Sequence, residues 1–351
     1  MHDLLHAYAS EIAMADHDPA PADAARRLFD YYLHSAALAN QLLTPHRVRV
    51  PLTGDHDAGR DFADAAAAKR WLTVEEPNLI AMSRLDDPDL DEHRWQLAYV
   101  LRDYFYLTRQ LDGWLETHEH ALHAAMRSGN AWAEGLTRNN LGMVMTALGR
   151  LTDAEPHFTA AGKIFERLGD QMGTSNSLAN TASILRRRGD PAGALAHLRT
   201  ALVQYREMGS ANHVGITLRS MANALLQLGQ ADEAVRCAQE AVDLATWLEF
   251  PLDIAQADNI LGAAHRQLGQ LTLAEIAYQQ ALEMSRRCES DFEQAWARRG
   301  LGAVALAAGR PGDALRHWQA ALVLYRDVGS TLADDVAADI HHVKAAQESP
   351  A

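Results

Sequence analysis

Apolar residues in the C-terminal two thirds of the sequence recur in paired runs at helical spacing. The run before Gly229 contains Leu218, Met221, Ala222, Leu225 and Leu228. The run after it continues with Ala234, Ala238, Ala241, Val242 and Ala245. Such spacing is typical of one face of an amphipathic helix. A glycine between two runs stands where a helix ends with positive φ, so each pair is predicted to be an antiparallel helical hairpin.

The hairpin repeats with a period of 40 residues, and its turn glycine recurs at Gly149, Gly189, Gly229, Gly269 and Gly309. Alanines follow the glycine after five residues at Ala154, Ala194, Ala234, Ala274 and Ala314, and after twelve at Ala161, Ala201, Ala241, Ala281 and Ala321. A small residue precedes it by seven at Gly142, Ala182, Ala222, Gly262 and Gly302. Because helices approach closely only where side chains are small, we expect packed seams at these positions. Periods of roughly 20–50 residues are typical of repeat arrays, which present function on a surface.

The period divides the sequence into four parts. Residues 131–330 hold five repeats, and residues 91–130 hold a degenerate capping copy in which Trp114 replaces a small residue. Residues 331–351 are predicted to form a C-terminal capping helix and tail. Residues 1–90 do not keep the period and are predicted to be a helical linker region. We expect helices there at Met1–Met14, Asp23–Leu43, Phe62–Leu72 and Glu75–Leu85, and a loop at Pro45–Arg60.

Charge and composition exclude several classes of protein. The 351 residues carry a formal net charge of −14 and include three lysines. An acidic protein lacks the basic face that neutralises phosphates, so direct nucleic-acid binding is not expected. The two cysteines, Cys237 and Cys288, are interpreted as small packing residues in a reducing compartment. No apolar run approaches the roughly 18 residues of a membrane span, and no basic signal-peptide region is present, so a soluble cytoplasmic protein is predicted.

Candidate catalytic and metal-binding chemistry is sparse. The sequence contains no Gly-x-Ser-x-Gly motif and no Gly-x-Gly-x-x-Gly motif after a strand, so we predict neither an enzyme nor a cofactor. His118, His120 and His123 lie near Glu116 on one predicted helix, but Leu122 stands where a His-Glu-x-x-His motif needs its second histidine. We interpret these histidines as a solvent-facing polar stripe and predict no metal site.

The 40-residue unit resembles the tetratricopeptide repeat. The matching positions in one unit are Leu141-Gly142, Ala154-x3-Phe158 and Ala161. That family's usual unit has about 34 residues, so longer helices would accommodate the difference. The resemblance covers roughly residues 90–346. It implies an all-α fold, a right-handed α-solenoid of tetratricopeptide-like helical hairpins with a 40-residue period.

The first ninety residues carry a second resemblance. The strings that carry it are Met1-His2-Asp3-Leu4-Leu5, Arg27-Leu28-Phe29-Asp30-Tyr31-Tyr32-Leu33 and Trp71-Leu72-x2-Glu75. They resemble the end of a winged helix and the following linker in actinobacterial NB-ARC (STAND-class) regulators, such as the Streptomyces antibiotic regulatory protein family. The resemblance implies that this chain is the sensor end of such a regulator. The sequence contains no Gly-x4-Gly-Lys-[Ser/Thr] loop, so we expect no nucleotide binding by this chain alone.

The tetratricopeptide resemblance also predicts where a ligand binds. In such arrays the first helix of each hairpin lines a concave groove, at sites 13, 10, 6 and 3 residues before the turn glycine. Those sites hold Asn139, Asn176, Asn223 and Asn259, Arg186, Arg219, Arg266 and Arg299, and Trp296. Asparagine can bind the backbone of an extended peptide, and arginine can pair with its carboxylates. We therefore expect a protein or peptide ligand in this groove.

Three functions remain open at this point. The chain is interpreted first as a peptide- or protein-binding module that forms the sensor or partner-docking part of a transcriptional regulator. A stand-alone tetratricopeptide scaffold or signalling-peptide receptor is the first alternative, and a small-molecule sensor that uses the concave groove is the second. No membrane partner is expected, and the sequence leaves a homo-oligomer open.

Overall fold

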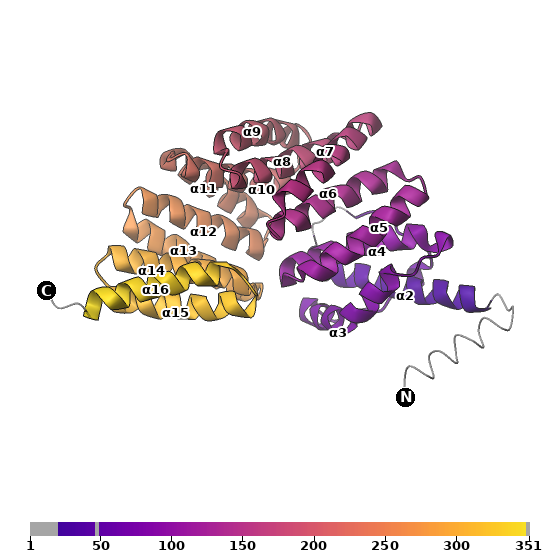
Figure 1. Cartoon of the computed structure of the whole chain (residues 1–351), viewed down its shortest axis with the longest axis horizontal. Coiled ribbons are helices and arrows are strands. Elements are labelled where there is room, and N and C mark those ends of the chain that lie inside the picture. The colour runs from indigo at the N-terminus through magenta and orange to yellow at the C-terminus, as the bar shows by residue number, and fades with distance from the viewer. Residues whose placement is uncertain (1–19, 46–48, 349–351) are drawn as a thin grey trace. The chain divides into compact units, whose positions relative to one another are not determined.

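The computed structural model describes residues 20–45 and 49–348, and every regular element in these ranges is a helix (Figure 1). The predicted helix at Met1–Met14 lies outside the described residues. The chain forms two compact units, Met1–Arg150 and Leu151–Ala351, and their boundary falls at the turn of the first 40-residue repeat. The predicted all-helical fold of repeated hairpins is confirmed.

The second unit consists of hairpins whose helices have nearly constant length. They are α7 (Leu151–Leu168), α8 (Gln171–Arg187), α9 (Pro191–Glu207), α10 (Ala211–Gln227), α11 (Ala231–Trp247), α12 (Pro251–Gln267), α13 (Leu271–Arg287), α14 (Asp291–Ala307), α15 (Pro311–Asp327) and α16 (Leu332–Glu348). Each helix from α8 to α16 has 17 residues. The residues beyond the usual repeat length are therefore used to lengthen the helices.

The turns between helices explain the glycine pattern, and they show a finer period than the one read from the sequence. All five turn glycines have positive φ, as predicted. The turns between hairpins also place a residue at positive φ, so that such residues occur every 20 positions. These further residues are Gly129, Gly169, Gly209, Glu249, Glu289 and Gly329, and Arg109 holds the turn position inside the capping hairpin of α4 and α5. A left-handed residue satisfies the last carbonyl groups of a helix and reverses the chain.

The predicted small positions do form the packed seams. Every alanine five or twelve residues after a turn glycine is at most 2% exposed. Gly262 and Gly302 leave room for large rings from the second helix of their hairpins. A Cβ atom on Gly302 would lie 2.3 Å from Nε1 of Trp318, and one on Gly262 would lie 2.9 Å from the Tyr278 ring. Small and aromatic residues are thus complementary at these two helix crossings.

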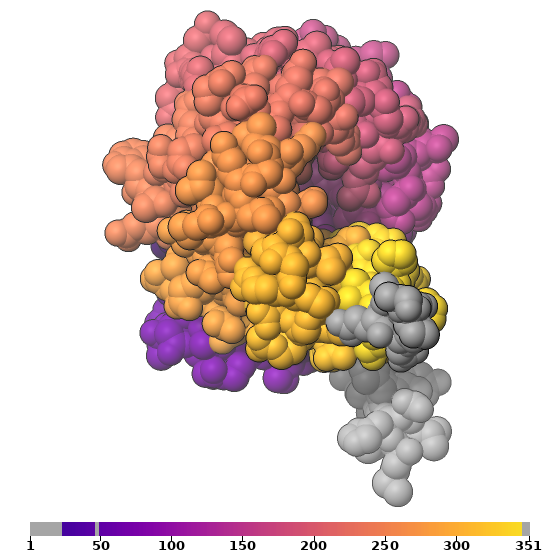
Figure 2. All heavy atoms as spheres, turned by 90° about the vertical axis from the view of Figure 1, so that its left-hand side faces the viewer, coloured from indigo at the N-terminus to yellow at the C-terminus, as the bar shows by residue number. Residues whose placement is uncertain are grey.

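The first helices of successive hairpins lie on one side of the second unit. In addition to the contacts between consecutive helices, α8 contacts α10, α10 contacts α12, and α12 contacts α14. Contacts between the corresponding second helices are fewer. First helices that approach each other more closely line the inside of a curved stack. Figure 2 shows the last helices of this unit, in orange and yellow, as a continuous surface of packed atoms.

The first unit has less regular geometry. Its elements are α2 (Ala20–Leu43), the 3₁₀ turn η1 (His56–Ala58), α3 (Ala65–Ser83), the 3₁₀ turn η2 (Pro88–Leu90), α4 (Asp91–Thr108), α5 (Leu111–Arg127) and α6 (Ala131–Ala147). α4 contacts α2, α3, α5 and α6 and is therefore the central helix of this unit. Trp114, which replaces a small residue of the repeat, is almost fully buried in the same core.

One prediction for the first unit is wrong. The sequence predicts separate helices at Phe62–Leu72 and Glu75–Leu85, whereas α3 runs without interruption over Ala65–Ser83. A proline inside a helix removes a hydrogen bond and usually ends the helix. Pro77 nevertheless lies within α3, because apolar residues on both sides of the expected break are buried in the core. Tertiary packing therefore overrides the local signal.

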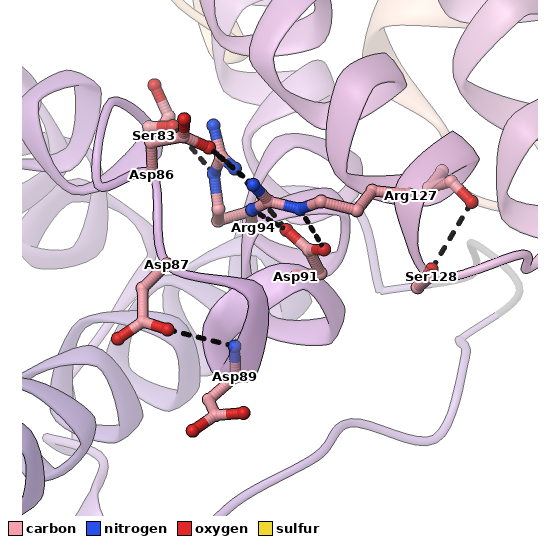
Figure 3. A network of polar contacts seen from close by, with 9 residues as sticks. Ser83, Asp86, Asp87, Asp89, Asp91, Arg94, Arg127 and Ser128 are labelled. Atoms are coloured by element: carbon pink, nitrogen blue, oxygen red, sulfur yellow. Dashed lines mark hydrogen bonds and ion pairs between the residues drawn. The ribbon is translucent and has the colours of Figure 1, made fainter.

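A buried ionic network connects α3, α4 and α5 (Figure 3). The side chain of Arg94 is 2% exposed, and it donates to the Ser83 carbonyl at 3.1 Å and to Asp91 at 3.3 Å. Arg127 on α5 donates to both carboxylate oxygens of Asp91 at 2.7 Å. Asp86 accepts from both arginines at the solvent-exposed side of the network. Buried charges require such complete pairing, so we assign this network a structural role.

Candidate functional site

The candidate site is the surface formed by the first helices of the second unit, α8, α10, α12 and α14. We define the inner face as the residues 13, 10, 6 and 3 positions before Gly189, Gly229, Gly269 and Gly309. Eight of the nine predicted binding residues lie on this face, and most of them are half-buried. Asn139 is the ninth. It is 6% exposed and lies on α6, which belongs to the first unit, so it falls outside the inner face as defined.

Two of the predicted arginines already have carboxylate partners within the protein. Arg219 on α10 donates to Oδ1 of Asp253 on α12 at 2.6 Å. Arg299 on α14 lies 3.5 Å from Asp335 and 3.6 Å from Asp339, both on α16. Each ion pair connects one first helix with the next. A ligand carboxylate would have to share these arginines or displace their partners.

Two of the predicted asparagines have structural hydrogen bonds. Asn259 is fully buried and donates from Nδ2 to Oε2 of Glu293 at 2.9 Å. Its Oδ1 atom is buried without a partner. Asn176 accepts a hydrogen bond from the Tyr205 hydroxyl at 2.6 Å. Asparagine is a poor helix former, and these contacts supply a reason for its presence in the first helices.

The contacts of Arg219 and Asn259 follow one rule that the sequence analysis missed. In each, the residue ten positions before the turn glycine reaches an acid in the first turn of the next first helix, 34 residues further along. The acids are Asp253 and Glu293, which are 40 residues apart. That spacing is a visible sequence signal. It indicates that this row of the inner face stabilises the stack.

A second row of the inner face has fewer internal partners. Arg186 and Arg266 lie three residues before their turn glycines, and neither forms an ion pair with a described residue. Arg266 is hydrogen-bonded to the Tyr278 hydroxyl on α13. Burial, and then the charge of Arg187, lower the pKa of Arg186. Asn223, on the intervening first helix, has no hydrogen bond to a described residue. These three side chains lie towards the C-terminal ends of α8, α10 and α12.

Trp296 is only partly available for binding. Its ring is half-buried and packs against the core formed by helices α8 to α13. Its edge also contacts Phe292, with ring centroids 6.5 Å apart at an angle of 84°. The tryptophan therefore contributes to packing between hairpins as well as to the inner face.

Enclosed space on the inner face is small. A cavity of about 10 Å³ lies among α10, α11 and α12, and it is bordered by Arg219, Asp253 and Phe250. Such a volume accommodates about one water molecule. This cavity among the described residues of the inner face is therefore too small for an organic ligand.

The histidine cluster on α5 differs from its prediction. His118 does not face solvent: it is 1% exposed, and its Nδ1 lies 3.0 Å from the Trp114 carbonyl oxygen. His120 and Glu116 are 3.8 Å apart at the surface, and Arg84 donates to the same glutamate. The predicted polar stripe is thus wrong for His118, because α5 turns that residue towards the core. No group of three or more potential metal ligands occurs among the described residues.

The two cysteines are placed as the packing interpretation requires. Cys237 is buried in the helix core of the second unit, and Cys288 is half-buried at the end of α13. Burial raises the pKa of the Cys237 thiol, and the nearby Glu233 and Glu240 raise it further. A raised pKa reduces the thiolate fraction and therefore the reactivity of the sulfur.

Sequence comparison establishes the family. Residues 134–207, 182–246 and 253–327 match the family model of the tetratricopeptide repeat and together cover more than half of the chain. The chain therefore belongs to the tetratricopeptide repeat family. Proteins of this family are typically non-enzymatic scaffolds, and no catalytic family is indicated. None of the described helices is long and apolar enough to cross a membrane.

One curated relative is a regulatory protein. The chain is 28% identical over 248 residues to the regulatory protein AfsR of Streptomyces griseus. The alignment covers 69% of this chain and 25% of AfsR, so the chain spans about a quarter of that protein's length.

Two solved structures show the same fold. A Rap protein complexed with Competence and Sporulation Factor matches with a TM-score of 0.56 and 14% identity, over 80% of this chain and 92% of that one. A signal transduction ATPase with numerous domains (STAND) from Pyrococcus horikoshii, which has a tetratricopeptide repeat sensor, matches with a TM-score of 0.54 and 13% identity. This match covers 81% of our chain and 49% of the other. At these identities the similarity concerns the fold alone.

Proposed function

We propose that this chain is a peptide- or protein-binding module and that it forms the sensor or partner-docking part of a transcriptional regulator. The similarity to AfsR supports the regulatory context. The fold shared with a tetratricopeptide sensor and with a Rap protein in complex supports a binding role. The observation that carries the binding proposal is the row formed by Arg186, Asn223 and Arg266 on three successive first helices.

The division of the inner face into two rows supports one position for the partner. Arg219, Asn259 and Arg299 already connect neighbouring helices, so their contacts stabilise the stack whether or not a partner is present. Arg186 and Arg266 form no such contact with the next first helix. Arg266 is hydrogen-bonded to Tyr278 on the second helix of its own hairpin, and both guanidinium groups can pair with acidic groups of a partner. Asn223 can donate to and accept from its backbone. We therefore place an extended segment across the C-terminal halves of α8, α10 and α12.

Binding is tested with peptides selected from a random 12-residue display library on the purified chain. Arg266→Ala and Asn223→Ala should each weaken a selected peptide about tenfold, since hydrogen bonds to charged and polar groups contribute about 1–2 kcal/mol. Arg236→Ala, at an exposed site on the opposite helix of its hairpin, is the matched control and should have no effect. Equal losses in all three variants, or none, would show that the inner face is not the site.

The regulatory part needs a separate experiment. The Arg266→Ala and Asn223→Ala substitutions are introduced together into the chromosomal gene of the source organism, and transcript levels are compared with those of an Arg236→Ala strain. A transcriptional sensor predicts altered expression of a defined set of genes in the first strain only. Unchanged transcripts together with lost peptide binding would favour the alternative, a tetratricopeptide scaffold or signalling-peptide receptor without a regulatory output.

A further inference from the structure

The first unit contains a cavity that the peptide-binding proposal does not use. It has a volume of about 350 Å³ and lies between α2, α4 and the segment 49–56. Its lining includes His34 and Leu38 from α2, Leu52 and His56 from the segment, and Tyr99 from α4. Small-molecule sites in proteins typically have volumes of about 300–1,000 Å³. The cavity is therefore large enough for a small organic ligand.

The wall of this cavity is held in place by specific hydrogen bonds. Thr53 is fixed on both sides: its carbonyl oxygen accepts from Nε2 of His34 at 2.9 Å, and its N–H donates to Oε1 of Gln96 at 2.8 Å. Further along, the N–H of Arg60 donates to the Ser35 hydroxyl at 2.9 Å. These contacts attach the segment to both α2 and α4, so the cavity is a preformed feature of the fold.

The length of the connection between α2 and α3 also indicates a function. Between Arg49 and Asp64 the chain forms only the short turn η1. Ordered connections longer than about 12–15 residues with little secondary structure are uncommon in compact domains, and they usually carry a function or are disordered. This one is fixed by buried side chains. A repeat array does not need such a wall, because its helices are joined by short turns.

The chemistry of the lining defines the class of ligand. Most of its surface is apolar, from residues that include Ala37, Val50 and Val100. The ionisable lining residues are His34, His56 and Arg49, together with Tyr99, and no carboxylate is among them. This is notable in a protein with a net charge of −14. An apolar cavity with basic groups is complementary to an apolar body that carries one negative charge.

We propose that this cavity is a binding site for a small organic acid, with an apolar or aromatic body and one anionic group that faces Arg49. The proposal is independent of the peptide-binding site, because all the lining residues belong to the first unit. It gives the module a second input, in which a small acid acts on the first unit while a partner occupies the inner face.

Two fluorescent probes of the same shape test the proposal on the full chain. The first is 8-anilinonaphthalene-1-sulfonate, which has an aromatic body and one negative charge. The second is N-phenyl-1-naphthylamine, which has nearly the same body and no charge. We expect the unaltered protein to bind one molecule of the charged probe per chain, and to bind it more tightly than the neutral one.

Ala37→Phe tests the location. Ala37 is half-buried and lines the cavity, so a phenyl ring there occupies the space of the ligand. Both probes should bind at least about tenfold more weakly, since the loss of a well-packed aromatic body is worth more than about 1.4 kcal/mol. Ala196→Phe, at an exposed site on α9, is the matched control and should bind both probes normally. Circular dichroism confirms that each variant is folded.

Arg49→Gln tests the charge. It should weaken the charged probe about tenfold and change the affinity for the neutral probe less than about twofold. Arg49→Lys restores the charge and should recover most of the loss. This variant separates charge recognition from the structural contacts of Arg49 with the Asn40 and Thr44 carbonyls. Absence of probe binding to the unaltered protein, or equal binding by Ala37→Phe, would overturn the site. Equal effects of Arg49→Gln on both probes would overturn the assignment of an acid.

Discussion

Asp258 should make the stability of the second unit depend on pH. This residue on α12 is 2% exposed, and its Oδ1 atom has no hydrogen-bond partner. Leu178 and Leu218 occupy the same position, eleven residues before the turn glycine, in the two preceding repeats. An aspartate at an apolar core position is poorly solvated. Burial accordingly raises the pKa of Asp258 from 3.8 to about 7.

The shift in the pKa of Asp258 sets the magnitude and the sign of the pH effect on the free energy of unfolding. It corresponds to about 4 kcal/mol of unfavourable free energy for the ionised carboxylate in the folded state. Because the pKa of Asp258 is higher in the folded protein than in the unfolded chain, the protein has its full stability below about pH 4. It is lost progressively as the pH rises to about 7, where the folded protein also ionises. Asp258→Asn removes the charge at every pH and should therefore abolish this loss.

The assay is urea unfolding followed by circular dichroism at pH 4, 6 and 8. At pH 8, the Asp258→Asn variant should be about 2–4 kcal/mol more stable than the unaltered protein. The Asp258→Leu variant, which restores the leucine of the preceding repeats, should be at least as stable as Asp258→Asn. At pH 4 the difference between Asn and Asp should be below about 0.5 kcal/mol. Asp327→Asn, at an exposed position on α15, is the control for a general loss of negative charge. Parallel pH profiles for Asp258→Asn and the unaltered protein would refute the reasoning.

Three further substitutions test the packing of the repeats and of the first unit. Glu249→Gly should stabilise the protein by about 1 kcal/mol. A non-glycine residue in the left-handed conformation costs about 1–2 kcal/mol, and the flexibility of glycine in the unfolded chain offsets part of the gain. A lower unfolding midpoint for this variant would contradict the presence of strain at Glu249. Ala241→Leu should overpack a buried seam and cost about 1–3 kcal/mol, whereas an unchanged melting temperature would place that alanine outside the seam. Asp91→Ala should cost about 3–5 kcal/mol, because it removes the buried partner of Arg94, and Asp89→Ala at the exposed turn beside it should cost little.

The regular part of the fold could be predicted because its contacts recur at fixed sequence separations. Ala154 and Ala161 are buried for the same reason as their counterparts 40 residues further on, so each copy repeats the same local signal. The turn glycines adopt positive φ as their spacing indicates. The 20-residue spacing of left-handed residues was not predicted, because Arg109, Glu249 and Glu289 occupy three of those positions without being glycine.

The binding role of the inner face stays a prediction. The sequence places Arg186, Asn223 and Arg266 on first helices, because residue position within a repeat determines the direction of a side chain. It did not distinguish them from Arg219 and Asn259, whose partners lie in the next repeat. That distinction depends on the spacing between stacked helices, which a single helix does not encode.

The sequence by itself determined the class of fold, the length of the repeat and the helices that form the inner face, because short-range periodicity reflects contacts between neighbours in the chain. Only the tertiary structure decided which polar residues are already paired, that α3 continues through Pro77, and that segment 49–56 forms one wall of a cavity with α2 and α4. These features arise where residues distant in sequence meet without a repeating pattern. Their geometry depends on the packing of the whole unit, and no local spacing records it.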